Sequence, residues 1–227
     1  RSDQALPGSG VGPSVPGIAV LRYESRTRQY SGIERSASFT LADEMVDDVL
    51  AALELLERIG RLDHVRVFVL GHGLGGYSIP RIATLTQDVA GYIVLAGGAR
   101  PIPDLIVERL EYVAGLDGEF TGDERVLINA TSAEVAAIEA LGSGDGSSGL
   151  LLGAGPTYWL DLAGYEPALE ALEIGAPMLI VQGGSDYRVT VQDYGLWQSA
   201  LADRPDVQFK RYPGLNHFFV AIDGIST

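Results

Sequence analysis

An apolar run that ends in a glycine-rich turn places the strongest single constraint on the fold of this chain. Residues 65–70 read V-R-V-F-V-L, and residues 71–76 read G-H-G-L-G-G. A short apolar run followed by glycines is typical of a buried strand that turns sharply into a helix. We therefore predict a strand over residues 65–70, a turn, and a helix that continues to about Thr86.

The glycine turn fits two sequence patterns that serve different chemistries. Gly71, Gly73 and Gly76 satisfy G-x-G-x-x-G, in which a dinucleotide pyrophosphate lies at a helix N-terminus. The same turn fits G-x-S-x-G, the elbow that carries a nucleophilic serine, with Gly73 at the serine position and Gly75 closing the pattern. Arg100 favours the first pattern, because an arginine just past the next strand can bind the 2′-phosphate of NADP.

Strand and helix patterns alternate along most of the chain. Residues 17–23 and 92–96 are short apolar runs that predict strands, and Thr40 can cap a helix that starts at Leu41 and stops at Gly60. Such alternation implies a parallel sheet. The alternation resumes later with strands at residues 177–182 and 207–212 and a helix at residues 191–201.

A long segment interrupts this alternation. Residues 101–173 are mostly helical in pattern and are too many for a simple connection between a strand and a helix. The predicted organisation is therefore an α/β core made of residues 1–100 and 174–227, with residues 101–173 as a helical cap insertion.

The first residues of the chain do not fit a complete core. Residues 7–10 read P-G-S-G, which is typical of a loop after a strand, yet six residues separate Gly10 from the apolar run at Gly17. A parallel crossover needs about a dozen residues or more. We therefore expect residues to be missing between about Gly10 and Gly17.

Composition excludes several functional classes. The 227 residues are 46% hydrophobic, enough for the core of one domain. The chain has no cysteine and its three histidines form no H-E-x-x-H pair, so we expect no metal and no cofactor. A formal charge of −14 without a basic cluster argues against nucleic acid as a partner. No apolar run reaches the roughly 20 residues of a membrane span, so we expect a soluble protein, with its compartment and any homo-oligomeric state left open.

Two later loops carry side chains that favour the elbow over the dinucleotide turn. The predicted strand 177–182 runs into G-G-S-D, which ends at Asp186, and the strand 207–212 runs into P-G-L-N-H, which ends at His217. A nucleophile, an acid and a histidine in this chain order form the constellation of a serine hydrolase. Because parallel strands end at one edge of a sheet, Gly73, Asp186 and His217 are expected to lie together.

These motifs together resemble the α/β-hydrolase superfamily and, within it, bacterial dienelactone-hydrolase-like esterases. The resemblance rests on G-H-G-L-G-G at residues 71–76, G-G-S-D-Y-R-V-T at residues 183–190 and Y-P-G-L-N-H at residues 212–217. It implies an α/β-hydrolase fold, with a mostly parallel sheet flanked by helices and a helical cap. It also implies hydrolysis of a small-molecule carboxylic ester by a Ser-Asp-His triad.

The resemblance further implies a role for each residue of the site. Asp186 would orient His217 and stabilise its charged form, while the other ring nitrogen of His217 serves as general base and then acid. The backbone N–H groups of Leu74 and Ser9 would form the oxyanion hole. The insertion would cover the pocket, with Tyr158 and Trp159 in contact with the substrate.

The glycine at position 73 determines what activity to expect. Gly73 has no nucleophile, so the acyl-enzyme route is closed, and Ser78 should lie in the following helix, away from the turn. One interpretation is an esterase whose serine has been replaced. The alternative is a natural non-hydrolytic homologue that binds a ligand or uses Asp186 and His217 for proton transfer. A remoter alternative is an NADP-dependent oxidoreductase.

Overall fold

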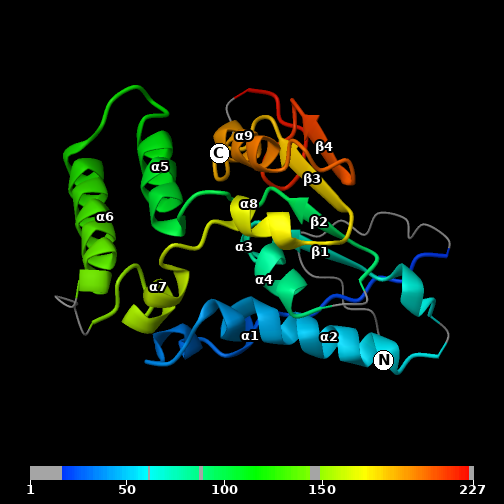
Figure 1. Cartoon of the computed structure of the whole chain (residues 1–227). Coiled ribbons are helices and arrows are strands. Elements are labelled where there is room, and N and C mark those ends of the chain that lie inside the picture. Colours follow the sequence, from blue (N-terminus) through cyan, green and yellow to red (C-terminus); the bar gives the residue numbers. More distant parts are fainter. Residues whose placement is uncertain (1–16, 61, 87–88, 144–148, 225–227) are drawn as a thin grey trace.

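Four parallel strands, adjacent in chain order, form the centre of the molecule (Figure 1). The computed structural model describes residues 17–60, 62–86, 89–143 and 149–224. Parallel neighbours require helical crossovers, and the chain supplies them, which confirms the predicted α/β sheet. The strands are β1 (Phe68–His72), β2 (Gly91–Leu95), β3 (Met178–Gly183) and β4 (Val207–Tyr212).

One face of the sheet carries the main core. Val69 pairs in register with Tyr92, and Tyr92 pairs with Met178, so their side chains form one buried row across three strands. Burying each large apolar side chain contributes about 1.5–3 kcal/mol. Helices α2 (Asp47–Glu57), α4 (Ile79–Thr84), α8 (Pro167–Glu170) and α9 (Val191–Ala200) supply the residues that pack on this row.

The expected strand at residues 17–23 is wrong. Residues 18–25 have no regular secondary structure, and Ile18 and Val20 are 62% and 73% exposed. Within the described part of the chain, β1 is an edge strand, with β2 as its only neighbour. An extended segment without a strand beside it has no ladder to join, so its apolar residues stay exposed. The expected gap between Gly10 and Gly17 lies outside the described residues.

The expected start of the strand at residue 65 is also wrong. Residues His64–Arg66 form one turn of 3-10 helix, because the side chain of Asp63 accepts the backbone N–H of Val65 at 3.2 Å. The strand β1 then begins at Phe68 and continues through His72, two residues further than predicted. The Asp63 cap therefore favours a helical turn at residues 64–66, although the apolar pattern of residues 65–70 predicts a strand there.

The predicted helix after Thr40 is confirmed, although its first turn is wider than an α-helix. Residues Ala42–Val46 form a π-helical turn that continues into α2. Thr40 and Asp43 cap this start reciprocally: the Thr40 backbone N–H donates to the Asp43 carboxylate at 2.9 Å, and the Asp43 N–H donates to the Thr40 hydroxyl at 3.4 Å. A shorter helix, α1 (Arg26–Gln29), lies before this turn.

The helix after the glycine turn has two parts. It begins as α3 (Leu74–Tyr77), bends at Ser78, and continues as α4 to Thr84. The Ser78 hydroxyl donates to the Leu74 carbonyl oxygen at 2.7 Å, and the side chain is fully buried. A serine that bonds back to the preceding turn bends a helix in this way. Ser78 therefore lies at the junction of the two helices, with its hydroxyl bonded to the Leu74 carbonyl oxygen.

The segment between β2 and β3 is helical and stands partly apart from the sheet. Figure 1 shows α5 and α6 side by side at one end of the molecule. A reciprocal cap between Thr121 and Glu124 fixes the start of α6. Within the described residues, no helix is both long and apolar enough to cross a membrane. The helices here are α5 (Ile102–Ala114), α6 (Gly122–Ala140) and α7 (Pro156–Leu162).

Candidate active site

The turn after β1 has the geometry of a strained elbow. Gly73 has φ 56° and ψ −117°, a backbone conformation that residues with a side chain rarely adopt. An ideal Cβ placed on Gly73 would lie 3.3 Å from Nε2 of His217. Position 73 therefore directs a side chain at the imidazole. Gly71 is required by close packing, because a Cβ there would lie 2.2 Å from the Gly75 carbonyl oxygen.

Asp186 and His217 form a buried hydrogen-bonded pair. The loop after β3 carries Asp186, the loop after β4 carries His217, and the two side chains meet with 2.8 Å between Oδ2 and Nδ1. The Asp186 side chain is fully buried, and its carboxylate also accepts the backbone N–H of Arg188 at 2.8 Å and of Val189 at 3.0 Å. These bonds hold an ionised carboxylate, so Nδ1 donates and Nε2 is left as the basic nitrogen.

His72 holds the loop that carries His217 through a side-chain hydrogen bond. Its Nε2 lies 2.8 Å from the backbone carbonyl oxygen of His217, so this nitrogen carries the proton and donates. The two imidazole rings lie 4.6 Å apart between centroids. Burial lowers the pKa of His72, which keeps the ring neutral beside His217. The structure therefore places His72 as a support for the loop.

A cavity of about 470 Å³ opens directly on Gly73 and His217. Leu74 also lines it and begins α3, so its backbone N–H lies at the positive end of the first helical turn. A neighbouring cavity of about 820 Å³ shares Tyr77 as a lining residue but contains neither Gly73 nor His217. The smaller cavity is the candidate substrate site, because of these two cavities it is the one lined by His217.

Tyr158 and Trp159 both line this cavity, and both are already engaged in hydrogen bonds. The Tyr158 hydroxyl donates to Glu44 at 2.7 Å, and the Trp159 indole N–H donates to the Leu151 carbonyl oxygen at 2.8 Å. Burial is the main cause of a raised pKa at Tyr158, which keeps its hydroxyl protonated. The two rings therefore offer their apolar surfaces to a ligand and use their polar atoms to hold the wall in place.

Sequence reasoning missed two arginines in the same wall. Arg109 on α5 and Arg188 in the Asp186 loop both line the cavity. The proximity of Arg188 to Asp186 in G-G-S-D-Y-R-V-T was a readable signal. Arg109 lies in the helical insertion, and nothing in the sequence shows that α5 brings it to the base.

The arginine expected to favour NADP is held elsewhere. The Arg100 guanidinium lies 2.7 Å from the fully buried Asp193 carboxylate and 2.6 Å from Glu108. Two carboxylates neutralise this side chain, so the expectation that it faces a 2′-phosphate is not supported by its position. Asp193 is likewise committed to Arg100, which leaves Asp186 as the acid beside His217. Ser9 lies outside the described residues, which also contain no cluster suited to a metal ion.

Comparison with known proteins decides the family. A model of the alpha/beta hydrolase family matches residues 6–223. The chain belongs to the alpha/beta hydrolase family. Esterase EstD of Thermotoga maritima is 32% identical to it over 220 residues, covering 95% of this chain and 49% of that protein. The chain spans about half the length of this curated relative.

The fold is similar to that of a solved structure, Est1E from Butyrivibrio proteoclasticus. Est1E from Butyrivibrio proteoclasticus superposes with a TM-score of 0.51 at 16% identity, covering 80% of this chain and 64% of that chain. An esterase from Pyrococcus furiosus has a TM-score of 0.49 at 14% identity, covering 79% and 56% of the two chains. At such low identity the likeness to Est1E is one of fold.

Proposed function

We propose that the cavity at Gly73 is the acyl-transfer site of a carboxylic ester hydrolase in which glycine occupies the nucleophile position. One observation carries the proposal: Nε2 of His217 lies 3.3 Å from the Cβ position of residue 73, while Nδ1 is bonded to Asp186. The name of the relative Esterase EstD supports an ester substrate. The narrower place among dienelactone-hydrolase-like esterases rests on the three sequence motifs around these residues.

The proposed chemistry requires a hydroxyl at position 73. A serine oxygen would attack the ester carbonyl carbon while His217 takes its proton, and Asp186 would stabilise the imidazolium that forms. The N–H of Leu74, with that of Ser9, would donate to the carbonyl oxygen as it becomes negative. His217 would return the proton to the departing alcohol, and water would then release the acid from the acyl-enzyme. With Gly73 the first step has no nucleophile, so the chain is inactive by this route.

The helical segment at residues 101–173 is proposed to cover the site. Ile102, Leu105 and Arg109 on α5 line the cavity from one side, and Tyr158 and Trp159 on α7 line it from another. Walls of apolar and aromatic side chains exclude water from the carbonyl, which strengthens the electrostatic interactions inside. We expect these helices to contact the acyl or alcohol part of the substrate.

Restoring the serine tests the proposal. Gly73→Ser is expected to hydrolyse short acyl esters such as p-nitrophenyl acetate, with an initial burst of p-nitrophenol. Gly73→Ala is the matched control, because it has the added Cβ without the hydroxyl. The double variant Gly73→Ser, His217→Ala should lose the gained activity. A folded Gly73→Ser protein that hydrolyses no simple ester would overturn the proposal.

A second candidate function is ligand binding or proton transfer by the unmodified chain. Gly73 itself favours it, because the cavity and the Asp186–His217 pair are complete without a nucleophile. In that case the parent protein should bind esters or catalyse a reaction that His217→Ala abolishes, and Gly73→Ser should form no acyl-enzyme. These two outcomes separate the candidates.

A further inference from the structure

Most arginines of this acidic protein pair with an acidic side chain, and two of the unpaired ones lie together in the candidate substrate cavity. The chain has 30 acidic residues against 16 basic ones, so an arginine finds an acid easily. Within the segments that the structure describes, five arginines form no ion pair. Of these, Arg109 and Arg188 line the cavity that holds His217, whereas Arg22, Arg125 and Arg211 do not. Eight other arginines each lie within 4.0 Å of an acidic side chain: Arg26, Arg28, Arg35, Arg58, Arg66, Arg81, Arg100 and Arg204.

The two arginines lie next to each other beside the proposed base. Nε of Arg109 donates to the Arg188 backbone carbonyl oxygen at 3.0 Å. The Arg188 guanidinium lies 5.2 Å from the ring centroid of Phe218, the residue after His217, and 5.7 Å from that of Tyr187. Contacts with aromatic rings hold this guanidinium in place without neutralising it.

Placing two cations together in a partly buried wall is unfavourable unless a ligand offsets it. Burial and the nearby Arg188 charge both lower the pKa of Arg109, while Asp186 acts in the opposite direction. The Asp186 carboxylate is already bonded to His217 and to two backbone N–H groups, so it is a poor partner for either arginine. The pair therefore has unused capacity to bind an anion.

We propose that Arg109 and Arg188 bind a carboxylate carried by the ester substrate, so that the site selects anionic esters over neutral ones. This inference rests on the proposed ester chemistry at residue 73. The wall formed by Glu34 and Glu44 belongs to the same cavity and repels such a group. The carboxylate is therefore directed to the arginine side, and the scissile carbonyl to residue 73.

Binding to the protein as it exists provides the test, because Gly73 prevents acyl transfer. Monomethyl glutarate has one ester and one carboxylate, and dimethyl glutarate replaces that carboxylate with a second neutral ester. We expect calorimetry to show that the monoester binds about tenfold more tightly, the equivalent of one charge-assisted contact. The preference should weaken as salt is raised.

Variants that lack the arginine charges test whether Arg109 and Arg188 cause the preference for the monoester. Arg109→Gln with Arg188→Gln should abolish the preference by lowering the affinity for the monoester to that for dimethyl glutarate, and circular dichroism checks that the variant is folded. Arg125→Gln is the matched control, since Arg125 lies on α6 outside the cavity and forms no ion pair among the described residues. Each single variant is measured as well, so that the test does not depend on the double variant folding.

Two results overturn the inference. One is equal affinity for the two esters in the parent protein, and the other is a preference that survives in the charge-removed variants. Failure of the ester chemistry itself has a different signature. In that case Gly73→Ser hydrolyses neither ester, whereas hydrolysis of both esters with equal kcat/KM rejects only the arginine site.

Discussion

At the scale of single residues, the backbone of Gly73 sets the stability cost of a nucleophile. Its φ of 56° strains any residue that has a Cβ. We expect Gly73→Ala to lower the free energy of unfolding by about 1–3 kcal/mol. Gly195→Ala is the control, because Gly195 lies inside α9 with open space at its Cβ position. That change should raise stability by about 0.5–1 kcal/mol. Urea titrations that give both variants the same shift would contradict this account of the elbow.

A second residue-scale prediction concerns the pH dependence contributed by His72. Burial lowers its folded-state pKa below the ordinary 6.5, so the unfolded chain binds the proton more tightly. The His72 contribution to stability is therefore lost as pH falls from about 6.5 toward the folded pKa. Burial is the largest influence on the pKa of His72; the hydrogen bond to the His217 carbonyl oxygen and the nearby Asp186 charge raise it, and the Arg188 charge lowers it.

Replacing His72 should remove that contribution. We expect the unfolding free energy of His72→Phe to fall less steeply than that of the parent between pH 7 and pH 5. Chemical denaturation at several pH values measures the difference, and His64→Phe is the control for loss of an exposed histidine. Parallel curves for His72→Phe and the parent would show that the proton uptake belongs to other groups.

At the scale of elements, one ion pair ties the start of α5 to α9. The Asp193 carboxylate is fully buried and accepts the backbone N–H of Ala99 at 2.9 Å as well as the Arg100 guanidinium. Asp193→Ala leaves the Ala99 N–H without this acceptor and Arg100 with Glu108 as its remaining acidic partner, so it should destabilise the fold by about 1–3 kcal/mol. Asp203→Ala, at an exposed position after the same helix, should change stability by less than about 0.5 kcal/mol. Similar melting temperatures for the two variants would contradict a structural role for Asp193.

The strands and the site residues differ in how well the sequence predicts them. The apolar runs that became β2, β3 and β4 each have strand neighbours, so pattern and structure agree there. The run at residues 17–23 has the same pattern, but a strand also needs a partner, which pattern does not report. Asp186 and His217 were readable because chain order after parallel strands fixes their edge of the sheet. The position of Arg109 in the site could not be predicted from the sequence, because it depends on how α5 packs over that edge of the sheet.

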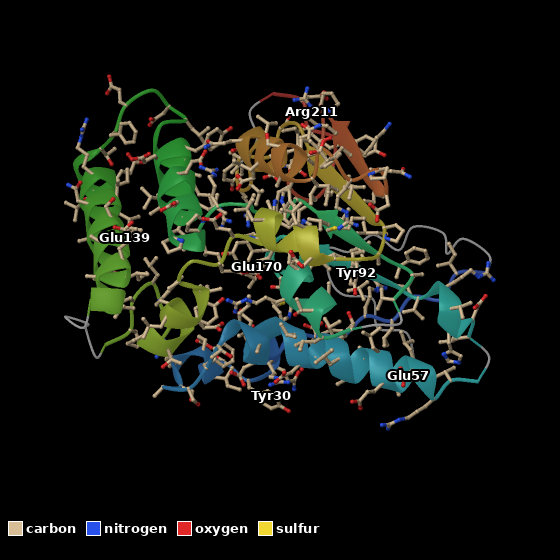
Figure 2. All side chains as sticks on the ribbon, viewed as in Figure 1. Tyr30, Glu57, Tyr92, Glu139, Glu170 and Arg211 are labelled. Atoms are coloured by element: carbon tan, nitrogen blue, oxygen red, sulfur yellow. The ribbon has the colours of Figure 1, made fainter. Side chains whose placement is uncertain are left out.

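At the scale of the whole molecule, the excess of acidic side chains opposes folding. The formal charge is −14, and two of the acids labelled in Figure 2, Glu57 on α2 and Glu139 on α6, are exposed. Salt screens this repulsion, so raising NaCl from about 20 to about 300 mM should raise the melting temperature by roughly a few degrees. Sodium nitrate at equal ionic strength is the control for a chloride-specific effect. A melting temperature that stays constant or falls in both salts would contradict a repulsive net charge.

The central claim is that residue 73, Asp186 and His217 form one acyl-transfer site. The most direct measurement is the intact mass of Gly73→Ser after brief exposure to p-nitrophenyl acetate, with peptide mapping of any adduct. We predict one acetyl group on residue 73 when the reaction is quenched at low pH, and no such adduct in Gly73→Ser, His217→Ala, which lacks the base for acylation. A folded Gly73→Ser protein that shows no acetyl group on residue 73 would contradict the account.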